Sequence, residues 1–104
     1  MINMLIYNVT TKVELSIQQS WVEWMKNKHI PQVMNSGCFA KFQFVQVLET
    51  DESDGFTYAV QYYADNNKDY QRYIDQFAPA LRLDAMNTWG NKFAGFRSLM
   101  QVVH

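Results

Sequence analysis

The sequence predicts an α+β fold in which a four-stranded antiparallel sheet carries two helices on one face. Strand-like and helix-like segments follow one another in the order β-α-β-β-α-β, an Asp-Gly insert joins the two middle strands, and the two helices are of similar length. This order is the split βαβ arrangement of ferredoxin-like domains. The chain has 104 residues and shows no linker or repeat, so a single domain over residues 1–104 is expected.

The four strands are expected at residues 4–13, 38–50, 56–65 and 94–103. Each is rich in β-branched or aromatic residues, which favour a pleated surface. The polar insert that ends in Asp54-Gly55 is typical of a hairpin, so the two middle strands should pair antiparallel.

The first helix is expected to begin at Ile17, with Ser16 as its cap. Apolar residues then recur at helical spacing on one stripe, which consists of Ile17, Trp21, Trp24 and Met25. Pro31 disfavours helical geometry at Ile30. The helix should therefore kink at this point and end at the stop signal of residues 35–37.

The second helix carries the strongest periodic pattern of the chain, and Asn66 or Asn67 is placed to cap it. Its apolar residues are spaced as on one helical face: Tyr70, Tyr73, Ile74, Phe77 and Leu81. Pro79 predicts a bend near Ala78, and Gly90 predicts the end of the helix.

The strands alternate poorly between apolar and polar residues, although one face of such a sheet is normally exposed to water. Aromatic residues also make up 15% of the chain, which is generous for the interior of a small domain. A second sheet, supplied by another copy of the chain, would cover the open face. We therefore expect a homodimer.

Several segments resemble a family of short, uncharacterised bacterial proteins in the dimeric α/β-barrel superfamily. The resemblance lies in the run Trp21–Pro31 with Val33-Met34 and Gly37-Cys38-Phe39, in residues 70–81 with their Ala78-Pro79 step, and in Lys92-Phe93 and Phe96-Arg97. Gln32 stands where the family commonly has an acidic residue. The resemblance implies a ferredoxin-like fold and a dimer, and it transfers no reaction because the family is a domain of unknown function. Its superfamily includes cofactor-independent monooxygenases, haem-degrading enzymes, muconolactone isomerase-like enzymes and ligand-sensing modules.

Composition argues against several classes of function. The net charge of −1 is spread along the chain, which gives no footprint for nucleic acid, and no apolar run is long enough to span a membrane. The single cysteine, Cys38, favours a reducing compartment and thus a cytoplasmic protein, and we expect it to be a small core residue. The histidines and Cys38 show no metal-ligand spacing, and the four glycines form no phosphate-binding loop. We expect no cofactor and no metal.

His29 is the first candidate catalytic residue, because an imidazole serves as acid or base near neutral pH. The competing interpretation is that a histidine near the C-terminal end of a helix stabilises the helix dipole.

Polar residues within the strands are candidates for a ligand site, in particular Asn8, Gln61 and Arg97. Buried polar groups need partners, and these residues could be paired across strands or with a carboxylate. Alternatively, they point into a pocket between sheet and helices, where polar groups would orient an apolar ligand. Five aromatic residues are candidates for the walls of that pocket: Tyr7, Trp21, Trp24, Tyr63 and Phe77.

These observations favour a protein that binds a small apolar or aromatic ligand. Two alternatives remain open. The protein could be a cofactor-independent enzyme, similar to monooxygenases or isomerases, with His29 as acid or base, or its surplus aromatics could serve only to pack a structural homodimer.

Overall fold

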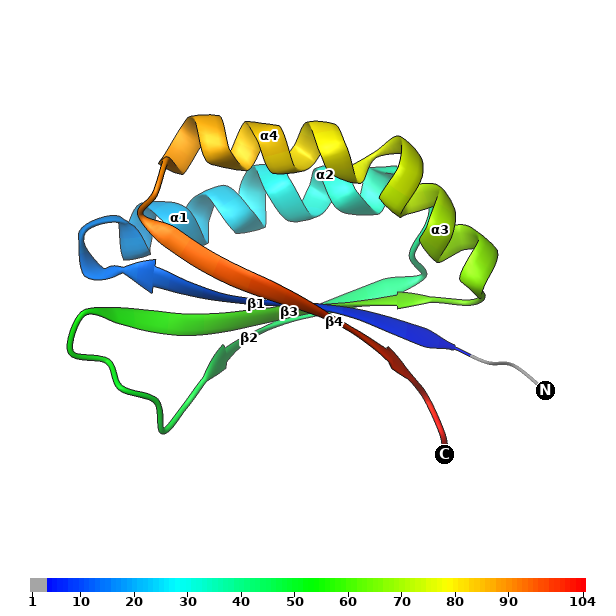
Figure 1. Ribbon diagram of the computed structural model, residues 1–104, viewed down its shortest axis with the longest axis horizontal. Helices are drawn as coiled ribbons and strands as arrows, with labels where there is room; N and C mark the ends of the chain where they lie inside the picture. The colour runs from blue at the N-terminus through cyan, green and yellow to red at the C-terminus, as the bar shows by residue number, and fades with distance from the viewer. Residues whose placement is uncertain (1–3) are drawn as a thin grey trace.

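The computed structural model describes residues 4–104 and has a four-stranded antiparallel sheet in the order β2-β3-β1-β4 (Figure 1). This is the strand order of a ferredoxin-like domain, so the predicted fold class is confirmed. The strands are β1 (Leu5–Glu14), β2 (Lys41–Val47), β3 (Gly55–Ala64) and β4 (Phe93–Gln101).

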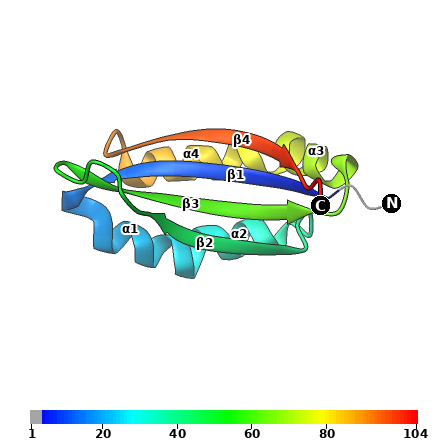
Figure 2. The same ribbon diagram turned by 90° about the horizontal axis from the view of Figure 1, so that it is seen from below.

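The helices all lie on one face of the sheet (Figure 1). Figure 2 looks onto the other face, which no helix covers; it is called the open face below. The same view places α1 and α2 behind β2 and β3, and α4 behind β1 and β4. The helical segments are the 3-10 turn η1 (Leu15–Ile17), α1 (Gln18–Trp24), the π-helical segment η2 (Met25–His29), α2 (Ile30–Asn35), α3 (Asn67–Gln76) and α4 (Ala78–Trp89).

The expected kink at Ile30 is replaced by the π-helical segment η2. Met25 and Ile30 are both buried although they are five residues apart, a spacing that a regular α-helix would rotate by about 140°. In η2 the N–H of Ile30 donates to the carbonyl of Met25, the five-residue bond of a π-helix, which keeps both side chains facing the sheet. Ile30 itself has helical angles, so the prediction that Pro31 forces it out of the helix is wrong. Pro31 is instead tolerated in the first turn of α2.

Two other boundaries differ from expectation. Ser16 does not cap a helix, because it lies inside η1 and no side-chain cap bond forms there. The second strand begins at Lys41 and not at residue 38, because Cys38 and Phe39 turn into the core below the helices. Cys38 is free and buried, as expected for a small core residue.

The second helical region follows its predicted signals. The side chain of Asn66 accepts a hydrogen bond of 2.9 Å from the N–H of Asp69, so Asn66 is the cap. The helix breaks at Phe77, between α3 and α4, because Pro79 lacks the donor to continue the ladder. Gly90 ends α4 with a positive φ of 62°, a conformation that glycine adopts without steric cost.

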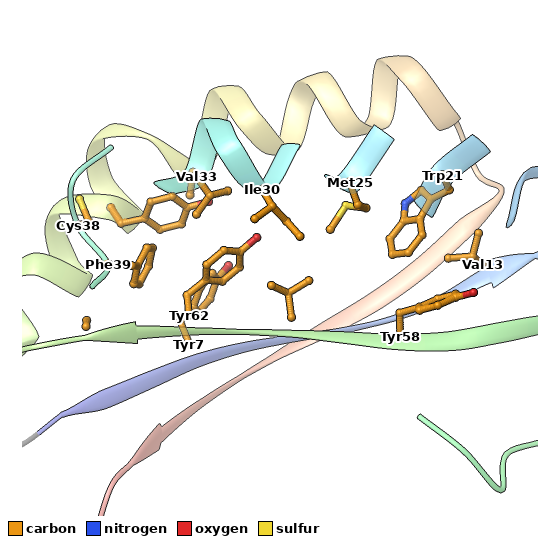
Figure 3. Close-up of a cluster of buried hydrophobic side chains, with 14 of the residues drawn as sticks. Tyr7, Val13, Trp21, Met25, Ile30, Val33, Cys38, Phe39, Tyr58 and Tyr62 are labelled. Carbon is orange, nitrogen blue, oxygen red and sulfur yellow. The ribbon is translucent and has the colours of Figure 1, made fainter. Parts of the chain in front are cut away.

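The core lies between the helices and the covered face of the sheet. In the register of β1 and β3, Tyr7 is opposite Tyr62 and Val13 is opposite Phe56. Figure 3 shows Tyr7, Tyr58 and Tyr62 rising from the strands toward the helices, with the helical side chains Trp21, Met25, Ile30 and Val33 pointing down to meet them. This layer is unusually aromatic, and one end of it is hollow.

Candidate functional site

A cavity of about 360 Å³ lies between the covered face of the sheet and the helices α1, η2 and α4. Its lining is predominantly apolar, and its aromatic members are Tyr7, Trp21, Trp24, Tyr58, Tyr62, Tyr73, Phe93 and Phe96. The ionisable nitrogen side chains on the wall are those of His29, Arg82 and Arg97. Cavities of this size and lining are common for small-molecule ligands.

The cavity opens between α4 and β4. The exposed side chains that line it include Met86 on α4, which is 62% exposed, and Arg97 on the covered side of β4. The lining residues from β3 are buried, with Tyr62 at 2%, and so is Trp21 of α1 at 3%, while Trp24 of α1 is half-buried. The mouth of the cavity is therefore bordered by α4 and β4, and its floor is formed by α1 and the central strands.

The π-helical segment positions His29 at this cavity. Trp24 and His29 are five residues apart, and their rings stack at 4.9 Å with an interplanar angle of 24°. In a regular α-helix, residues at this spacing point in directions about 140° apart and do not stack. The same widened turn that keeps Ile30 in the core thus places His29 and Trp24 side by side on the cavity wall.

His29 is held as a neutral imidazole by its surroundings. Burial lowers the pKa of His29, and the carboxylate of Asp84 opposes that shift only in part. Its Nδ1 atom is buried without a hydrogen-bond partner among residues 4–104. Asp84 is in turn 3.5 Å from the Nζ of Lys28. The interpretation of His29 as a stabiliser of a helix C-terminus is wrong, because the chain stays helical through Asn35.

Two tyrosine hydroxyls face the cavity as hydrogen-bond donors. The Nη2 atom of Arg82 donates to the hydroxyl of Tyr7 at 3.3 Å. Burial raises the pKa of Tyr7 to about 12, partly offset by the charge of Arg97. Burial also raises the pKa of Tyr62 well above its ordinary value, and the Tyr62 hydroxyl has no partner among the described residues. Both hydroxyls therefore keep their protons at neutral pH.

Residues 4–103 match the family of the domain of unknown function DUF4286. The chain belongs to this family. The match confirms the resemblance to an uncharacterised family that the sequence motifs predicted. None of the curated proteins compared matches the chain.

Solved structures similar to this DUF4286 domain share its fold at low sequence identity. A dimeric ferredoxin-like protein from an uncultured marine organism has a TM-score of 0.71 at 14% identity, covering 98% of this chain and 97% of its own. An EthD-like protein from Ralstonia eutropha has a TM-score of 0.70 at 11% identity, covering 100% and 96%. The cofactor-independent oxygenase SnoaB from Streptomyces nogalater, in a mutant form, has a TM-score of 0.67 at 9% identity, covering 96% and 94%.

The DUF4286 domain brings five of the predicted site residues together on the cavity wall, and these are Tyr7, Trp21, Trp24, His29 and Arg97. Phe77 does not line the cavity; it packs against the core where α3 meets α4. No helix in residues 4–104 is long and apolar enough to cross a membrane. Within the same residues, no three His, Cys, Asp or Glu side chains lie close enough together to hold a metal ion.

The prediction that Asn8, Gln61 and Tyr63 point into this cavity is wrong. Side chains alternate between the faces of a strand, and Tyr7 and Tyr62 face the helices, so the neighbouring residues face the open side. There Asn8 Nδ2 donates to Thr10 Oγ1 at 3.0 Å, and the Tyr63 hydroxyl donates to Gln61 Oε1 at 3.4 Å. These amides belong to the open face.

Arg82 and Tyr62 were not among the predicted site residues. For Arg82, the sequence does contain a signal, since Ala78, Arg82, Ala85 and Trp89 recur at helical spacing and mark a face of α4. A charged residue on such a stripe indicates either a partner or a site. Tyr62 lies within the strand expected at residues 56–65, and no sequence pattern shows that its hydroxyl lacks a partner.

Proposed function

We propose that this domain binds a small apolar or aromatic molecule in the cavity between the sheet and α4. The observation that carries the proposal is the cavity of about 360 Å³ with its tryptophan and tyrosine lining, open between α4 and β4. Well-packed interiors contain few voids larger than a water molecule, so a space of this size is more than a packing defect. Apolar cavities bind ligands of matching size because contact with their walls replaces contact with water.

The test is a cavity-filling variant. Ala85 of α4 lines the cavity, so Ala85→Phe places a ring inside it, whereas Leu83 of the same helix is exposed and does not line it. Binding of the fluorescent apolar probe phenylnaphthylamine is followed by the rise of the probe's own emission in an apolar site. We expect Ala85→Phe to weaken binding at least tenfold and the control Leu83→Phe to leave it unchanged. Wild-type-like binding by a folded Ala85→Phe variant refutes the proposal, and the milder Ala85→Leu serves if Ala85→Phe does not fold.

A second candidate function, cofactor-independent catalysis, is favoured by the position of His29. The side chain lies on the cavity wall as a neutral imidazole with the carboxylate of Asp84 nearby, which suits a general base. A neutral imidazole at this wall would accept a proton from an acidic C–H or O–H group of a bound molecule. The oxygenase SnoaB, with the same fold, is described as cofactor-independent, which is an analogy of fold alone.

Proton transfer is measured directly, without knowledge of the natural substrate. Exchange of the acidic C–H hydrogens of β-dicarbonyl compounds for deuterium is followed by NMR in the presence of the protein. We expect an acceleration over buffer that His29→Gln removes and His104→Gln does not, because His104 is exposed at the end of the chain. Equal exchange with and without protein across the panel counts against catalysis by His29.

We further infer that two copies of the chain pair through their open faces. This face carries apolar side chains from three strands, including Ile6, Tyr63 and Met100. Its charged residues lie toward the ends of their strands and are Lys12, Glu14 and Lys41. Four strands about 4.8 Å apart and about nine residues long present roughly 600 Å² per partner. Two such faces reach the lower bound of roughly 1,200 Å² for stable interfaces. A protein of this fold, from an uncultured marine organism, is described as dimeric.

The pairing is tested by placing a carboxylate at the centre of the open face. Thr10 lies there, opposite Ala59 and Phe96 in the register, so Thr10→Glu would bury an unpaired charge in the dimer. Light scattering should give a dimer mass for the wild type, a monomer mass for Thr10→Glu, and a dimer mass for the control Leu83→Glu on α4. A monomeric wild type at micromolar concentration refutes the pairing.

A further inference from the structure

The formal charges on the cavity wall have one sign. Arg82 and Arg97 border the cavity, and no Asp or Glu among the described residues does. The ion pairs within residues 4–104 are Lys12 with Asp54, Lys28 with Asp84 and Arg72 with Asp69, so neither cavity arginine is paired with a carboxylate of the described chain. His29 adds no further charge at neutral pH, because burial lowers the pKa of its imidazole. Two guanidinium groups beside an apolar space favour an anion, since a guanidinium donates paired hydrogen bonds to oxyanions.

The two arginines flank the mouth of the cavity from opposite sides. Arg82 comes from α4 and Arg97 from β4, the elements that border the opening. Arg82 donates to the Tyr7 hydroxyl at 3.3 Å, which leaves the proton of Tyr7 free to be donated elsewhere. Arg97 is paired in register with Val9, two residues from Tyr7 on β1, and its charge acts on Tyr7 and Tyr73. Cationic groups therefore converge near the hydroxyl of Tyr7.

The Tyr62 hydroxyl is a second and independent sign of a polar ligand group. Tyr62 is opposite Tyr7 in the register, lines the same cavity, and is buried to 2% exposure. Its hydroxyl finds no hydrogen-bond partner among the described residues, although buried hydroxyls are normally paired. A donor that is buried, unpaired and beside Tyr7 is placed to meet an acceptor atom brought by a ligand.

We propose that the ligand of this cavity is an amphipathic anion, namely a small apolar or aromatic molecule that bears one oxyanion group such as a carboxylate. The oxyanion lies near the mouth, between Arg82 and Arg97, and accepts hydrogen bonds from tyrosine hydroxyls. The apolar body extends to the floor formed by Trp21 and Tyr58. This inference rests on the proposed binding function and specifies the chemical class of the ligand.

A matched pair of probes separates the two ideas. Anilinonaphthalene sulfonate carries one anionic group, and its neutral parent phenylnaphthylamine has the same aromatic body without that group. Both report binding by fluorescence, and Ala85→Phe identifies the fraction of binding that occurs in the cavity.

The variants remove the charges one at a time and then together. We expect Arg82→Gln and Arg97→Gln each to weaken binding of the sulfonate probe about threefold, and the double variant to weaken it at least tenfold, while binding of the neutral probe changes less than twofold. A tenfold loss corresponds to about 1.4 kcal/mol, of the order expected for charged hydrogen bonds that are partly exposed to water. Lys68→Gln is the matched control, because Lys68 is an exposed cation on α3 that does not line the cavity.

Each outcome decides one of the two ideas. If the double variant binds both probes as the wild type does, and Ala85→Phe still blocks them, the ligand is not an anion and the cavity remains a binding site. If the wild type binds neither probe in the cavity, the proposed binding function fails and this inference fails with it. If the double variant does not fold, the single variants are compared with Arg97→Lys, which retains the charge. Arg97→Lys should keep most of the affinity for the sulfonate probe, whereas Arg97→Gln should not.

Discussion

Replacing Tyr62 by phenylalanine should stabilise the folded protein, against the usual effect of a core substitution. The Tyr62 hydroxyl is buried without a partner among residues 4–104, and leaving a buried polar group unpaired costs about 1–3 kcal/mol. The ring contacts with Tyr7 at 6.1 Å and Phe39 at 5.2 Å do not depend on the hydroxyl. We therefore expect Tyr62→Phe to raise the free energy of unfolding by about 1 kcal/mol.

Tyr58→Phe is the matched control. Tyr58 lies on the same face of β3 and is equally part of the core, but its hydroxyl accepts a hydrogen bond from Nε2 of Gln18. Removing that bond should lower the free energy of unfolding by about 1 kcal/mol. The two variants remove the same atom and should shift the urea midpoint in opposite directions, with a change in Tm of roughly 4–8 °C per kcal/mol.

A Tyr62→Phe variant that is less stable than the wild type would refute the reasoning, because it would show that the hydroxyl is satisfied in solution. The substitution also has a functional counterpart. Phenylalanine cannot donate to a ligand, so the stabilised variant should bind the sulfonate probe about threefold more weakly. Gain of stability with loss of affinity is the pattern expected where a site retains an unpaired group for its ligand.

Three further predictions concern the scaffold and His29. Val33→Ala should lower the free energy of unfolding by about 2 kcal/mol in urea titrations, because Val33 is 0% exposed and loses two buried methyl groups; a loss below about 0.5 kcal/mol would contradict the packing. Asn66→Ala should cost about 1 kcal/mol in thermal unfolding by removing the cap of α3, whereas Asn67→Ala, one residue later, should cost little. Burial holds the pKa of His29 in the folded protein below 6.5, so the unfolded chain takes up this proton first as the pH falls. The free energy of unfolding of the wild type should therefore fall relative to that of His29→Gln as the pH drops below 6.5. The difference between the two proteins should become constant once the pH is below the pKa of His29 in the folded protein. Parallel pH profiles of the two proteins would show that His29 is not buried as described.

Local signals in the sequence were sufficient for the order of elements and for the second helix. Asn66 caps α3 because its side chain satisfies an N–H that the helix leaves free, and Pro79 and Gly90 act through their own backbone restrictions. Each of these effects lies within a few residues of its cause. Such signals survive folding with little influence from tertiary contacts.

The faces of the strands could not be assigned in the same way. In β1, Tyr7 and Val9 on one face and Ile6 on the other are all apolar, so the pattern does not say which set meets the helices. A shift of one residue exchanges the two faces. Asn8 and Gln61 were therefore predicted to face the cavity, although they lie on the open face. Arg97 was correctly predicted to face the cavity, since it lies two residues from Gly95 on the covered side of β4.

The π-helical segment was also beyond prediction, and it matters most for the candidate site. Pro31 signalled an irregularity, but the sequence did not say that the preceding turn would widen so as to keep Met25 and Ile30 on one side. That widening is stabilised by burial of both residues, which is a tertiary effect. The stacking of His29 on Trp24 is a consequence of it, so the geometry of the candidate base depends on the core.

The cavity proposed for the ligand and the open face proposed for the partner lie on opposite sides of one sheet. Neighbouring residues of β1 point alternately to one and to the other. Tyr7 faces the cavity and Asn8 the open face, so a change on one side need not alter packing on the other. Thr10→Glu should therefore dissociate the dimer and leave affinity for the sulfonate probe within about twofold of the wild type. The edge strand β4 carries Arg97 toward the cavity and Met100 toward the open face. If Thr10→Glu loses both the dimer and the affinity for the sulfonate probe, then the partner chain holds β4 in place. The dimer would then be a condition for binding rather than a separate property.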